Sequence, residues 1–377
     1  MDLKQYINAY SLDSANSEGY RLGSFLDFFD ENFDKDLLSF DVFIIGVPEG
    51  RLSLGNESCA LAPDEIRSSL YDMYEGEWGL KILDLGNLRV GQTVEDTYAA
   101  LEQLTSYIIK LSKVLVVLGG GHDLITPIYR GQCILRKPLN FASADAYLDF
   151  QDGDNYHSRS FLSDLLASQE SMLSTYNLFG YQGYFCDPKE VHLLDQMNFN
   201  LLRLGEVNAN LKEMEPFIRC LDHISIDMSV VKFSEAPANP YSSPNGITAE
   251  GLCMMMRYAG LSNSIKSILF SELNPRLDKN SQSAKVYAQA IWYFLEGFHL
   301  RQDDLLTDKA INYKKFHVHS ELSELVFYKS VFNDKWWVDF SNEQGSDSNL
   351  LPCSSLDYIK AVDGELSERI LKYIRFK

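Results

Sequence analysis

The sequence predicts an α/β protein: a three-layer sandwich in which helices cover both faces of a mainly parallel sheet of about eight strands. Three observations support this. Short apolar runs rich in β-branched residues recur along the chain. Each run is followed by a turn signal and then by apolar residues at helical spacing. Some of the runs, such as Val114–Leu118, are continuously apolar, which is typical of strands buried on both faces, whereas half-exposed strands alternate.

The strands follow one another at intervals that leave room for a helix between most of them. Val114–Leu118, for example, holds five apolar residues in succession and ends at three glycines. The expected strands are Val42–Gly46, Ile82–Leu85, Val114–Leu118, Leu139–Ala142, Asn177–Phe179, Leu202–Leu204, Ile224–Ile226 and Ile268–Phe270.

The helices are predicted from caps and periodicity. Thr93 and Asp96 resemble a capping box, in which each side chain accepts a hydrogen bond from the other's backbone N–H. The apolar residues that follow recur at spacings of three and four, as on one face of a helix. Further helices are expected over Asn210–Cys220, Thr248–Tyr258 and Ser281–Phe298.

Three parts are expected along the chain. Residues 41–310 carry the βα rhythm and form the core. Residues 1–40 are acidic and aromatic, and the helical spacing of Phe25, Phe28, Phe29 and Phe33 predicts a helical extension. Residues 311–377 break the rhythm and form an appendage, with strand character at Lys335–Val338 and helical character at Leu366–Ile374.

Composition excludes several classes of protein. The chain has 34 Lys and Arg against 53 Asp and Glu, a net charge of −19, which disfavours nucleic acid as a partner. No apolar run approaches the roughly 20 residues of a membrane helix. The first residues resemble neither a signal peptide nor a transit peptide, so we expect a cytoplasmic protein. The six cysteines are dispersed and show neither zinc-ligand nor disulfide spacing, so we expect them to be free thiols.

The first candidate motif is Gly119–Gly121 followed by His122 and Asp123, at the end of a predicted strand. It lacks the Lys-Ser/Thr ending of a phosphate loop and the Gly-x-Gly-x-x-Gly of a dinucleotide fold, so neither ATP nor NAD is indicated. Taken alone, it is also compatible with a tight strand-to-helix turn in which Asp123 caps the helix.

Carboxylates follow two further predicted strands. Asp145, Tyr147 and Asp149 would share one face of an extended chain, and Asp227 and Ser229 would do the same after Ile224–Ile226. Open α/β sheets bind ligands at the carboxyl ends of their strands, and converging carboxylates suit a hard divalent cation. Each aspartate by itself could equally be a helix cap or a turn residue.

A fourth carboxylate, Glu272, follows the last core strand, and these four motifs in this order resemble the ureohydrolase family. That family, which includes arginase, agmatinase and formimidoylglutamase, hydrolyses amidine or guanidine groups at a pair of Mn²⁺ ions. The resemblance covers about residues 40–300 and includes Gly46–Pro48, Ala62–Arg67 and Asp84–Asn87. Within the family, formimidoylglutamase is the most similar member, on the evidence of Phe179–Gln182, Ser243–Gly246 and Arg257–Gly260.

The resemblance implies a metal site of which part is missing. His122, Asp145, Asp149 and Asp227 match the four ligands of one Mn²⁺ in the family. In the family, one His and one Asp bind the second ion and not the first. The resemblance implies that Tyr147 and Ser229 replace these two ligands here. Phenol and hydroxyl groups are poor substitutes for imidazole and carboxylate, so we expect at most one tightly bound Mn²⁺ per chain.

The resemblance also implies roles for two catalytic residues. Glu272 would pair with the cationic nitrogens of the substrate, and His157 would shuttle protons. A surface-loop position for His157 remains the alternative. The expected function is hydrolysis of a linear amidine or guanidine C–N bond in a small molecule, and the family forms homo-oligomers. The alternative is a catalytically impaired relative that keeps the fold for binding or as a scaffold.

Overall fold

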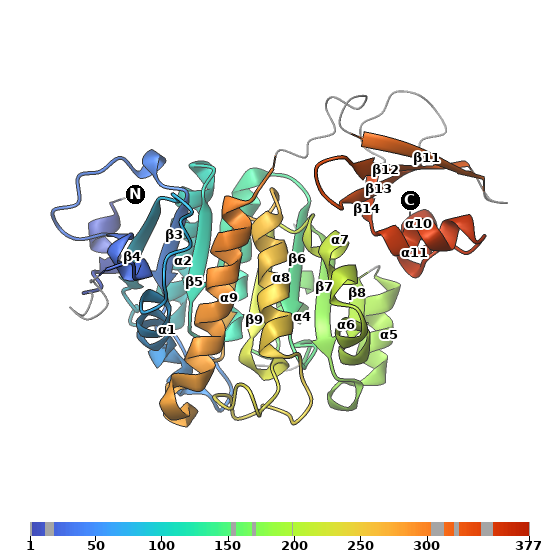
Figure 1. Ribbon diagram of the computed structural model, residues 1–377. Helices are drawn as coiled ribbons and strands as arrows, with labels where there is room; N and C mark the ends of the chain where they lie inside the picture. The colour runs from blue at the N-terminus through green and yellow to red at the C-terminus, as the bar shows by residue number, and fades with distance from the viewer. Residues whose placement is uncertain are drawn as a thin grey trace.

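The computed structural model describes residues 2–11, 19–151, 156–167, 171–197, 199–302, 313–319, 324–340 and 350–376. A central sheet runs through the middle of the core, and a smaller sheet with two helices lies at one end (Figure 1). No helix in the described ranges is long and apolar enough to cross a membrane.

The central sheet contains all eight predicted strands. Their order across the sheet is β4-β3-β5-β10-β9-β6-β7-β8, and every neighbouring pair among them is parallel. The strands are β3 (Val42–Gly46), β4 (Ile82–Leu88), β5 (Val114–Leu118), β6 (Leu139–Ala144), β7 (Leu173–Tyr181), β8 (Asn200–Arg203), β9 (His223–Asp227) and β10 (Ser267–Ser271).

Helices cover both faces of this sheet, so the prediction of a three-layer α/β fold is confirmed. Successive residues of β3 point to opposite faces: Ile44 packs in one hydrophobic cluster and Ile45 in the other. The first cluster includes residues of α1 (Ala62–Tyr71), α6 (Leu204–Ala209), α7 (Glu215–Ile218), α8 (Ala249–Leu261) and α9 (Gln282–His299). The second includes residues of α2 (Val94–Lys110), α3 (Ile125–Gln132), α4 (Phe161–Ala167) and α5 (Pro188–Gln196).

The helix predicted within residues 1–40 is wrong for the part that the structure describes. Among the described residues of this segment, 3₁₀ turns form over Leu3–Gln5, Leu22–Ser24 and Leu37–Ser39. Two short strands also form: β1 (Ile7–Asn8) pairs antiparallel with β4, and β2 (Asp27–Phe28) pairs parallel with it. Phe29 is buried, whereas Phe25 is 48% exposed, so the helical spacing does not produce one buried face. Backbone hydrogen bonds to the edge of the sheet outweigh the weak helical signal of spaced aromatic residues.

The helix predicted over Asn210–Cys220 is much shorter than expected. A 3₁₀ turn over Leu211–Met214 precedes α7, which holds only four residues and has Pro216 in its first turn. Proline is tolerated there because its missing N–H would have no partner within the helix. The capping box of Thr93 and Asp96 is confirmed, since both of its hydrogen bonds form at the start of α2.

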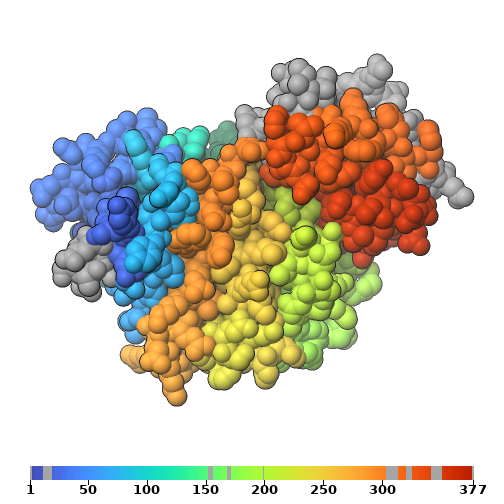
Figure 2. Space-filling view, viewed as in Figure 1, coloured from blue at the N-terminus to red at the C-terminus, as the bar shows by residue number. Residues whose placement is uncertain are grey.

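The C-terminal residues form a second, antiparallel sheet with its own hydrophobic cluster. In the space-filling view this part rests against one end of the core (Figure 2). The boundary expected at residue 310 lies outside the described residues. The elements are β11 (Tyr313–His319), β12 (Glu324–Ser330), β13 (Trp336–Asp339), β14 (Leu350–Cys353), α10 (Ser355–Val362) and α11 (Glu368–Phe376).

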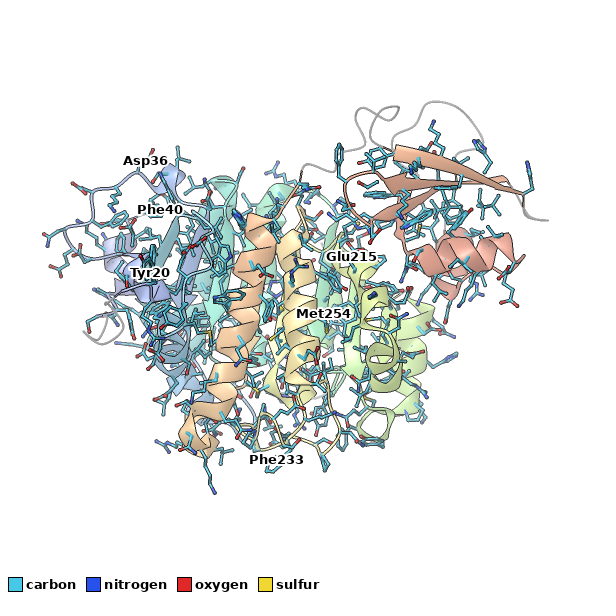
Figure 3. The ribbon with its side chains drawn as sticks, viewed as in Figure 1. Tyr20, Asp36, Phe40, Glu215, Phe233 and Met254 are labelled. Atoms are coloured by element: carbon cyan, nitrogen blue, oxygen red, sulfur yellow. The ribbon has the colours of Figure 1, made fainter. Side chains whose placement is uncertain are left out.

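The appendage lies away from the carboxyl ends of the parallel strands. Phe233, on the loop after β9, is at the lower end of the core, and Glu215 is at the upper end beside the appendage (Figure 3). The carboxyl ends of β5, β6, β9 and β10 therefore open at the end of the molecule opposite the appendage.

Candidate metal centre

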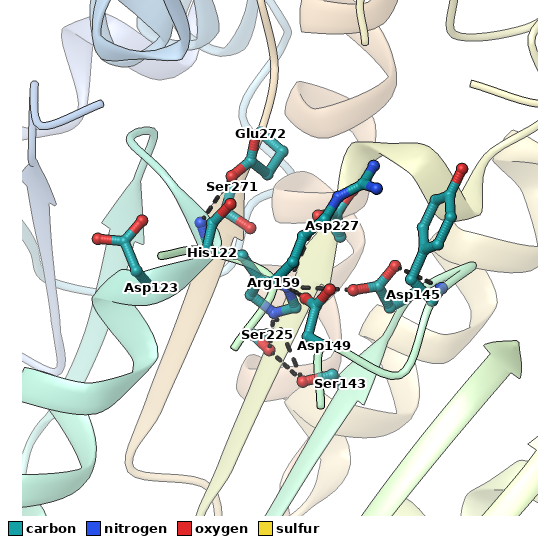
Figure 4. Close-up of polar contacts among 12 residues, drawn as sticks. His122, Asp123, Ser143, Asp145, Asp149, Arg159, Ser225, Asp227, Ser271 and Glu272 are labelled. Atoms are coloured by element: carbon teal, nitrogen blue, oxygen red, sulfur yellow. Dashed lines mark hydrogen bonds and ion pairs between the residues drawn. The ribbon is translucent and has the colours of Figure 1, made fainter. Parts of the chain in front are cut away.

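Four side chains converge at the carboxyl ends of three parallel strands (Figure 4). His122 follows β5, Asp145 follows β6, and Asp227 is the last residue of β9. Asp149 lies in the loop after Asp145, and its side chain points back toward the other three. All four residues are buried, and one potential ligand atom from each lies within 4.8 Å of all the others.

The imidazole of His122 is at the centre of this group. Its Nδ1 lies 2.9 Å from Asp149 Oδ2, 3.2 Å from Asp145 Oδ2 and 3.6 Å from Asp227 Oδ2. Asp145 Oδ2 is buried and makes no hydrogen bond. A buried carboxylate oxygen without a hydrogen bond is costly, and a bound cation would satisfy it. Three carboxylates and one imidazole are also a suitable donor set for Mn²⁺, so the residues present fit the ion.

A hydrogen-bond chain behind His122 holds the ring in position. Its Nε2 lies 2.7 Å from Ser225 Oγ, which lies 2.7 Å from Ser143 Oγ. Tyr176 in turn donates to Ser143 over 2.8 Å. If Nε2 donates its proton to Ser225, the lone pair of Nδ1 faces the carboxylates, which is the tautomer that a metal requires. Sequence reasoning missed these serines because a serine within a strand carries no distinctive signal.

Burial and mutual repulsion shift the pKa values of the cluster. Burial, and then the charge of Asp149, raise the pKa of Asp145 to about 7. Burial, and then Asp145, raise the pKa of Asp227 well above its ordinary value. Burial lowers the pKa of His122, but the adjacent carboxylates of Asp145 and Asp149 outweigh it and hold the pKa well above the usual range. Without another cation, the cluster therefore favours bound protons.

The expectation that residues 145, 147 and 149 share one face of an extended chain is wrong. The strand ends at Ala144, and Asp149 adopts a left-handed backbone conformation with φ of +50°. This turn brings Asp145 and Asp149 together and leaves Tyr147 outside the four-residue cluster, in the lining of the adjoining cavity. The Tyr147 ring is half-buried and stacks on Phe185, with ring centroids 5.0 Å apart.

Ser229 also departs from the expected extended geometry, because residues 228–230 form a 3₁₀ turn after β9. Its hydroxyl still reaches the cluster and donates to Asp145 Oδ1 over 3.1 Å. Its backbone N–H donates to Asp227 Oδ1 over 2.7 Å. Ser229 therefore donates one hydrogen bond to Asp145 and one to Asp227, so one oxygen of each carboxylate already has a partner in the protein.

Glu272 lies beside the cluster and is held by protein donors. It follows β10 with a left-handed φ of +62°. Its Oε1 accepts from the backbone N–H of His122 over 3.0 Å, and its Oε2 accepts from Asn56 Nδ2 over 2.7 Å and from Ser53. Ser53 and Asn56 were not found from the sequence, because they lie in an irregular loop without a recognisable motif.

His157 lies near the mouth of the site but outside the cluster. Its Nδ1 accepts the backbone N–H of Arg159 over 3.1 Å. Burial, and then the charge of Arg159, lower its pKa. Among the described residues, no hydrogen bond connects His157 to the four clustered side chains.

A model of the arginase family matches residues 40–296, which is more than half of the chain. The chain belongs to the arginase family. It is 24% identical to a formimidoylglutamase of Salmonella heidelberg over 247 residues, covering 63% of this chain and 78% of the relative.

Solved structures of named relatives share the fold of this arginase-family chain. Trypanosoma cruzi formiminoglutamase with Mn²⁺ superposes with a TM-score of 0.68 at 22% identity, covering 75% of this chain and 99% of the other. Formimidoylglutamase of Bacillus subtilis gives a TM-score of 0.67 at 18% identity, with coverages of 78% and 95%. By its relatives and its structure, the chain is formimidoylglutamase-like.

Proposed function

We propose that this chain hydrolyses a linear amidine C–N bond in a small molecule and uses one Mn²⁺ ion per chain. One observation carries the proposal: four buried side chains direct ligand atoms into one space, and Asp145 Oδ2 among them has no hydrogen bond. The names of the relatives support N-formimino-glutamate as the substrate. Addition of water would then give glutamate and formamide.

The four clustered residues would hold the ion through His122 Nδ1 and one oxygen each of Asp145, Asp149 and Asp227. When bound, Mn²⁺ acts as a Lewis acid and makes a water molecule a stronger nucleophile near neutral pH. The serine chain behind His122 keeps the imidazole oriented and fixes its tautomer.

Glu272 would bind the cationic nitrogens of the amidine. A carboxylate offers about four acceptor positions. Ser53, Asn56 and the His122 backbone use three of those positions and fix the carboxylate. The remaining position can accept a charge-assisted hydrogen bond from a substrate N–H, which orients the amidine carbon toward the four ligands.

His157 would carry protons at its Nε2, because its Nδ1 already accepts the N–H of Arg159. The lowered pKa keeps the ring neutral near pH 7, so that Nε2 can accept a proton and pass it to the leaving nitrogen. Among the described residues, no hydrogen bond joins His157 to the cluster, so a side-chain movement or a bridging water would complete this path.

A second candidate function is binding or scaffolding without turnover. Two points favour it: the family resemblance implies that Tyr147 and Ser229 replace the His and Asp that bind the second ion alone, and the cavity above the cluster has a free volume of about 10 Å³. That volume is about the minimum for one water molecule. A substrate could enter only after side chains at the mouth move.

Metal content and turnover, measured on the same preparation, test the proposal. The protein is purified in Mn²⁺, its metal content is determined by mass spectrometry, and release of formamide or urea is followed with N-formimino-glutamate, agmatine and arginine. We expect about one Mn²⁺ per chain and turnover of the first substrate. Asp227→Asn should lose both, and Asp164→Asn, a partly exposed acid paired with Arg130, serves as the matched control.

The outcomes separate the two candidates. One Mn²⁺ without turnover of any of the three substrates would favour the scaffold function. Absence of Mn²⁺ from the wild type would overturn the metal-dependent mechanism. A homo-oligomer and a cytoplasmic location remain proposals, which light scattering and cell fractionation can check.

A further inference from the structure

Arg159 lies over the mouth of the acidic cluster and was not predicted to have a role (Figure 4). Its guanidinium carbon is 4.3 Å from the centre of the Tyr147 ring and 3.7 Å from the centre of the Tyr241 ring. Two aromatic faces therefore hold one cation, an arrangement that suits the flat guanidinium of arginine better than the ammonium of lysine.

The backbone around Arg159 is tied to neighbouring loops. The N–H of Ser158 donates to the Leu52 carbonyl over 2.9 Å, and the Tyr241 hydroxyl donates to the Leu54 carbonyl over 2.8 Å. One of the two rings and the backbone that carries Arg159 are therefore anchored to the same loop. The position of the guanidinium is built into the fold.

The guanidinium faces the same small cavity as the candidate metal ligands. Asp149, Asp227, Ser229 and Glu272 line this cavity together with Arg159, and its free volume is about 10 Å³. No carboxylate of the described residues forms an ion pair with Arg159, whose guanidinium contacts the two rings instead. Its charge therefore lies in the lining of the same cavity as these carboxylates, held by aromatic rings.

The formal charges of the site show what this cation contributes. Asp145, Asp149, Asp227 and Glu272 carry four negative charges when ionised, and one divalent ion supplies two positive charges. Arg159 supplies a third positive charge from within the chain. A further divalent ion at the mouth would meet this fixed cation at short range and would lack the imidazole and carboxylate that Tyr147 and Ser229 replace.

We propose that Arg159, clamped between Tyr147 and Tyr241, is a built-in cation that closes the mouth of the acidic cluster and occupies the region where a second metal ion would otherwise bind. The inference rests on the proposed metal-binding function, because it assumes one ion at His122, Asp145, Asp149 and Asp227. It assigns to Arg159 two effects: it weakens binding of that ion, and it limits the site to one ion.

Mn²⁺ titrations of the full chain test this inference without an activity assay. Wild type is compared with Arg159→Gln, which removes the charge, and with Arg159→Lys, which keeps it. Arg130→Gln, at an exposed position away from the mouth, is the matched control. Affinity and stoichiometry are measured by isothermal titration calorimetry and equilibrium dialysis, and folding is checked by circular dichroism.

We expect Arg159→Gln to bind the first Mn²⁺ about tenfold more tightly than wild type. The substitution removes the repulsion between the guanidinium and the divalent ion, which acts even though solvent at the mouth partly screens it. Arg159→Lys and Arg130→Gln should bind within about twofold of wild type, because both keep the charge at the mouth. Removal of the ion by a chelator should also be faster from Arg159→Gln, because the mouth is then open.

Each outcome decides between the proposals. If wild type binds one Mn²⁺ and Arg159→Gln is folded and binds it with the same affinity and release rate, the inference is wrong and the metal site stands. If only Arg159→Gln binds Mn²⁺, Arg159 closes the site completely, and the proposed function of the wild type is overturned. If neither binds Mn²⁺, both proposals fail.

Discussion

Asp149 Oδ2 lies 2.9 Å from His122 Nδ1, and the Asp149 backbone adopts a left-handed φ of +50° to bring it there. A left-handed conformation costs a non-glycine residue roughly 1 kcal/mol or more. Glu272, beside the same cluster, has a φ of +62°. Two strained acidic residues at one site indicate that the fold holds these carboxylates at positions that local preference would not select.

Asp149→Asn should remove the stabilisation that Mn²⁺ gives to the folded chain. A ligand that binds only the folded state adds about 2.7 kcal/mol at a concentration one hundred times its Kd. Wild type should therefore melt several degrees higher in millimolar Mn²⁺, and Asp149→Asn should melt at the same temperature with and without the ion. Asparagine tolerates a left-handed backbone, so the variant tests the carboxylate rather than the turn.

Differential scanning calorimetry with and without millimolar Mn²⁺ provides the measurement. Asp164→Asn, outside the cluster, should keep the wild-type response. An Asp149→Asn variant that gains as much as wild type would show that Asp149 does not bind the ion.

Restoring a second metal ion should require three substitutions. Tyr147→His and Ser229→Asp add an imidazole and a carboxylate at the two replaced positions. Because the Tyr241 ring still holds Arg159 in the double variant, the charge of Arg159 should still exclude the second ion. Addition of Arg159→Gln should raise the metal content from about one to about two Mn²⁺ per chain, and the three changes should be strongly non-additive.

Mass spectrometry of dialysed protein counts the ions, and the two single variants and Arg159→Gln alone are the controls. A second ion already present in the double variant would show that ligand loss alone limits the site. Absence of a second ion from a folded triple variant would show that the surrounding loops have diverged as well.

The fold could be predicted from the sequence because its strands are buried on both faces. The core strands contain short apolar runs and are largely buried, except for β8 at the edge of the sheet. The alternation of strands and helices also leaves few possible topologies. The N-terminal segment was not predictable in this way. Strands as short as β2, with two residues, form only because the edge of β4 is available for pairing.

The clustered residues were found because strand ends collect ligands and because the order of the motifs resembles a known family. His122 comes after the predicted strand Val114–Leu118 and its three glycines, and Asp145 comes shortly after the predicted strand Leu139–Ala142. The position of Tyr147 could not be predicted, since the left-handed turn at Asp149 has no glycine to announce it. Arg159 was missed because its partners, Tyr147 and Tyr241, are far apart in the sequence and only the folded loops bring them together.

His223 should make stability depend on pH below neutrality. It is fully buried, and its Nε2 has no hydrogen-bond partner among the described residues. Burial, and then the charge of His122, lower its pKa to about 3. In the unfolded chain the pKa is about 6.5, so between pH 6.5 and 3 the unfolded state binds a proton that the native state excludes. Stability is therefore full above pH 6.5 and falls as the pH decreases, by about 1.4 kcal/mol per unit.

Urea unfolding at pH 7.0, 6.0, 5.0 and 4.5 measures this dependence. Other groups titrate in the same range, so the informative quantity is the difference between wild type and His223→Gln, which should change by roughly 2–3 kcal/mol from pH 6.5 to 4.5. The exposed residue His192 provides the control variant, His192→Gln. A difference curve that is flat with pH would mean that native His223 binds a proton as readily as the unfolded chain.

Arg219→Ala should loosen the C-terminal appendage from the core. Arg219 is buried, forms an ion pair with Glu215, donates to the Trp336 carbonyl over 2.9 Å and stacks on the Trp337 ring at 4.6 Å. Truncation leaves the partly buried carboxylate of Glu215 unpaired and removes the stacking, at a cost of about 2–4 kcal/mol. Because the appendage has its own hydrophobic cluster, the loss should fall mainly on its attachment and not on the central sheet.

Limited proteolysis and tryptophan fluorescence during urea unfolding should therefore show an early transition in Arg219→Ala that wild type lacks. Arg257→Gln, a partly exposed arginine that pairs with Glu296 within the core, is the matched control and should unfold like wild type. Mn²⁺ binding should be unchanged in Arg219→Ala, because the metal cluster lies at the opposite end of the core from the appendage. A single cooperative transition, shifted as a whole together with weaker Mn²⁺ binding, would show instead that appendage and core form one folding unit.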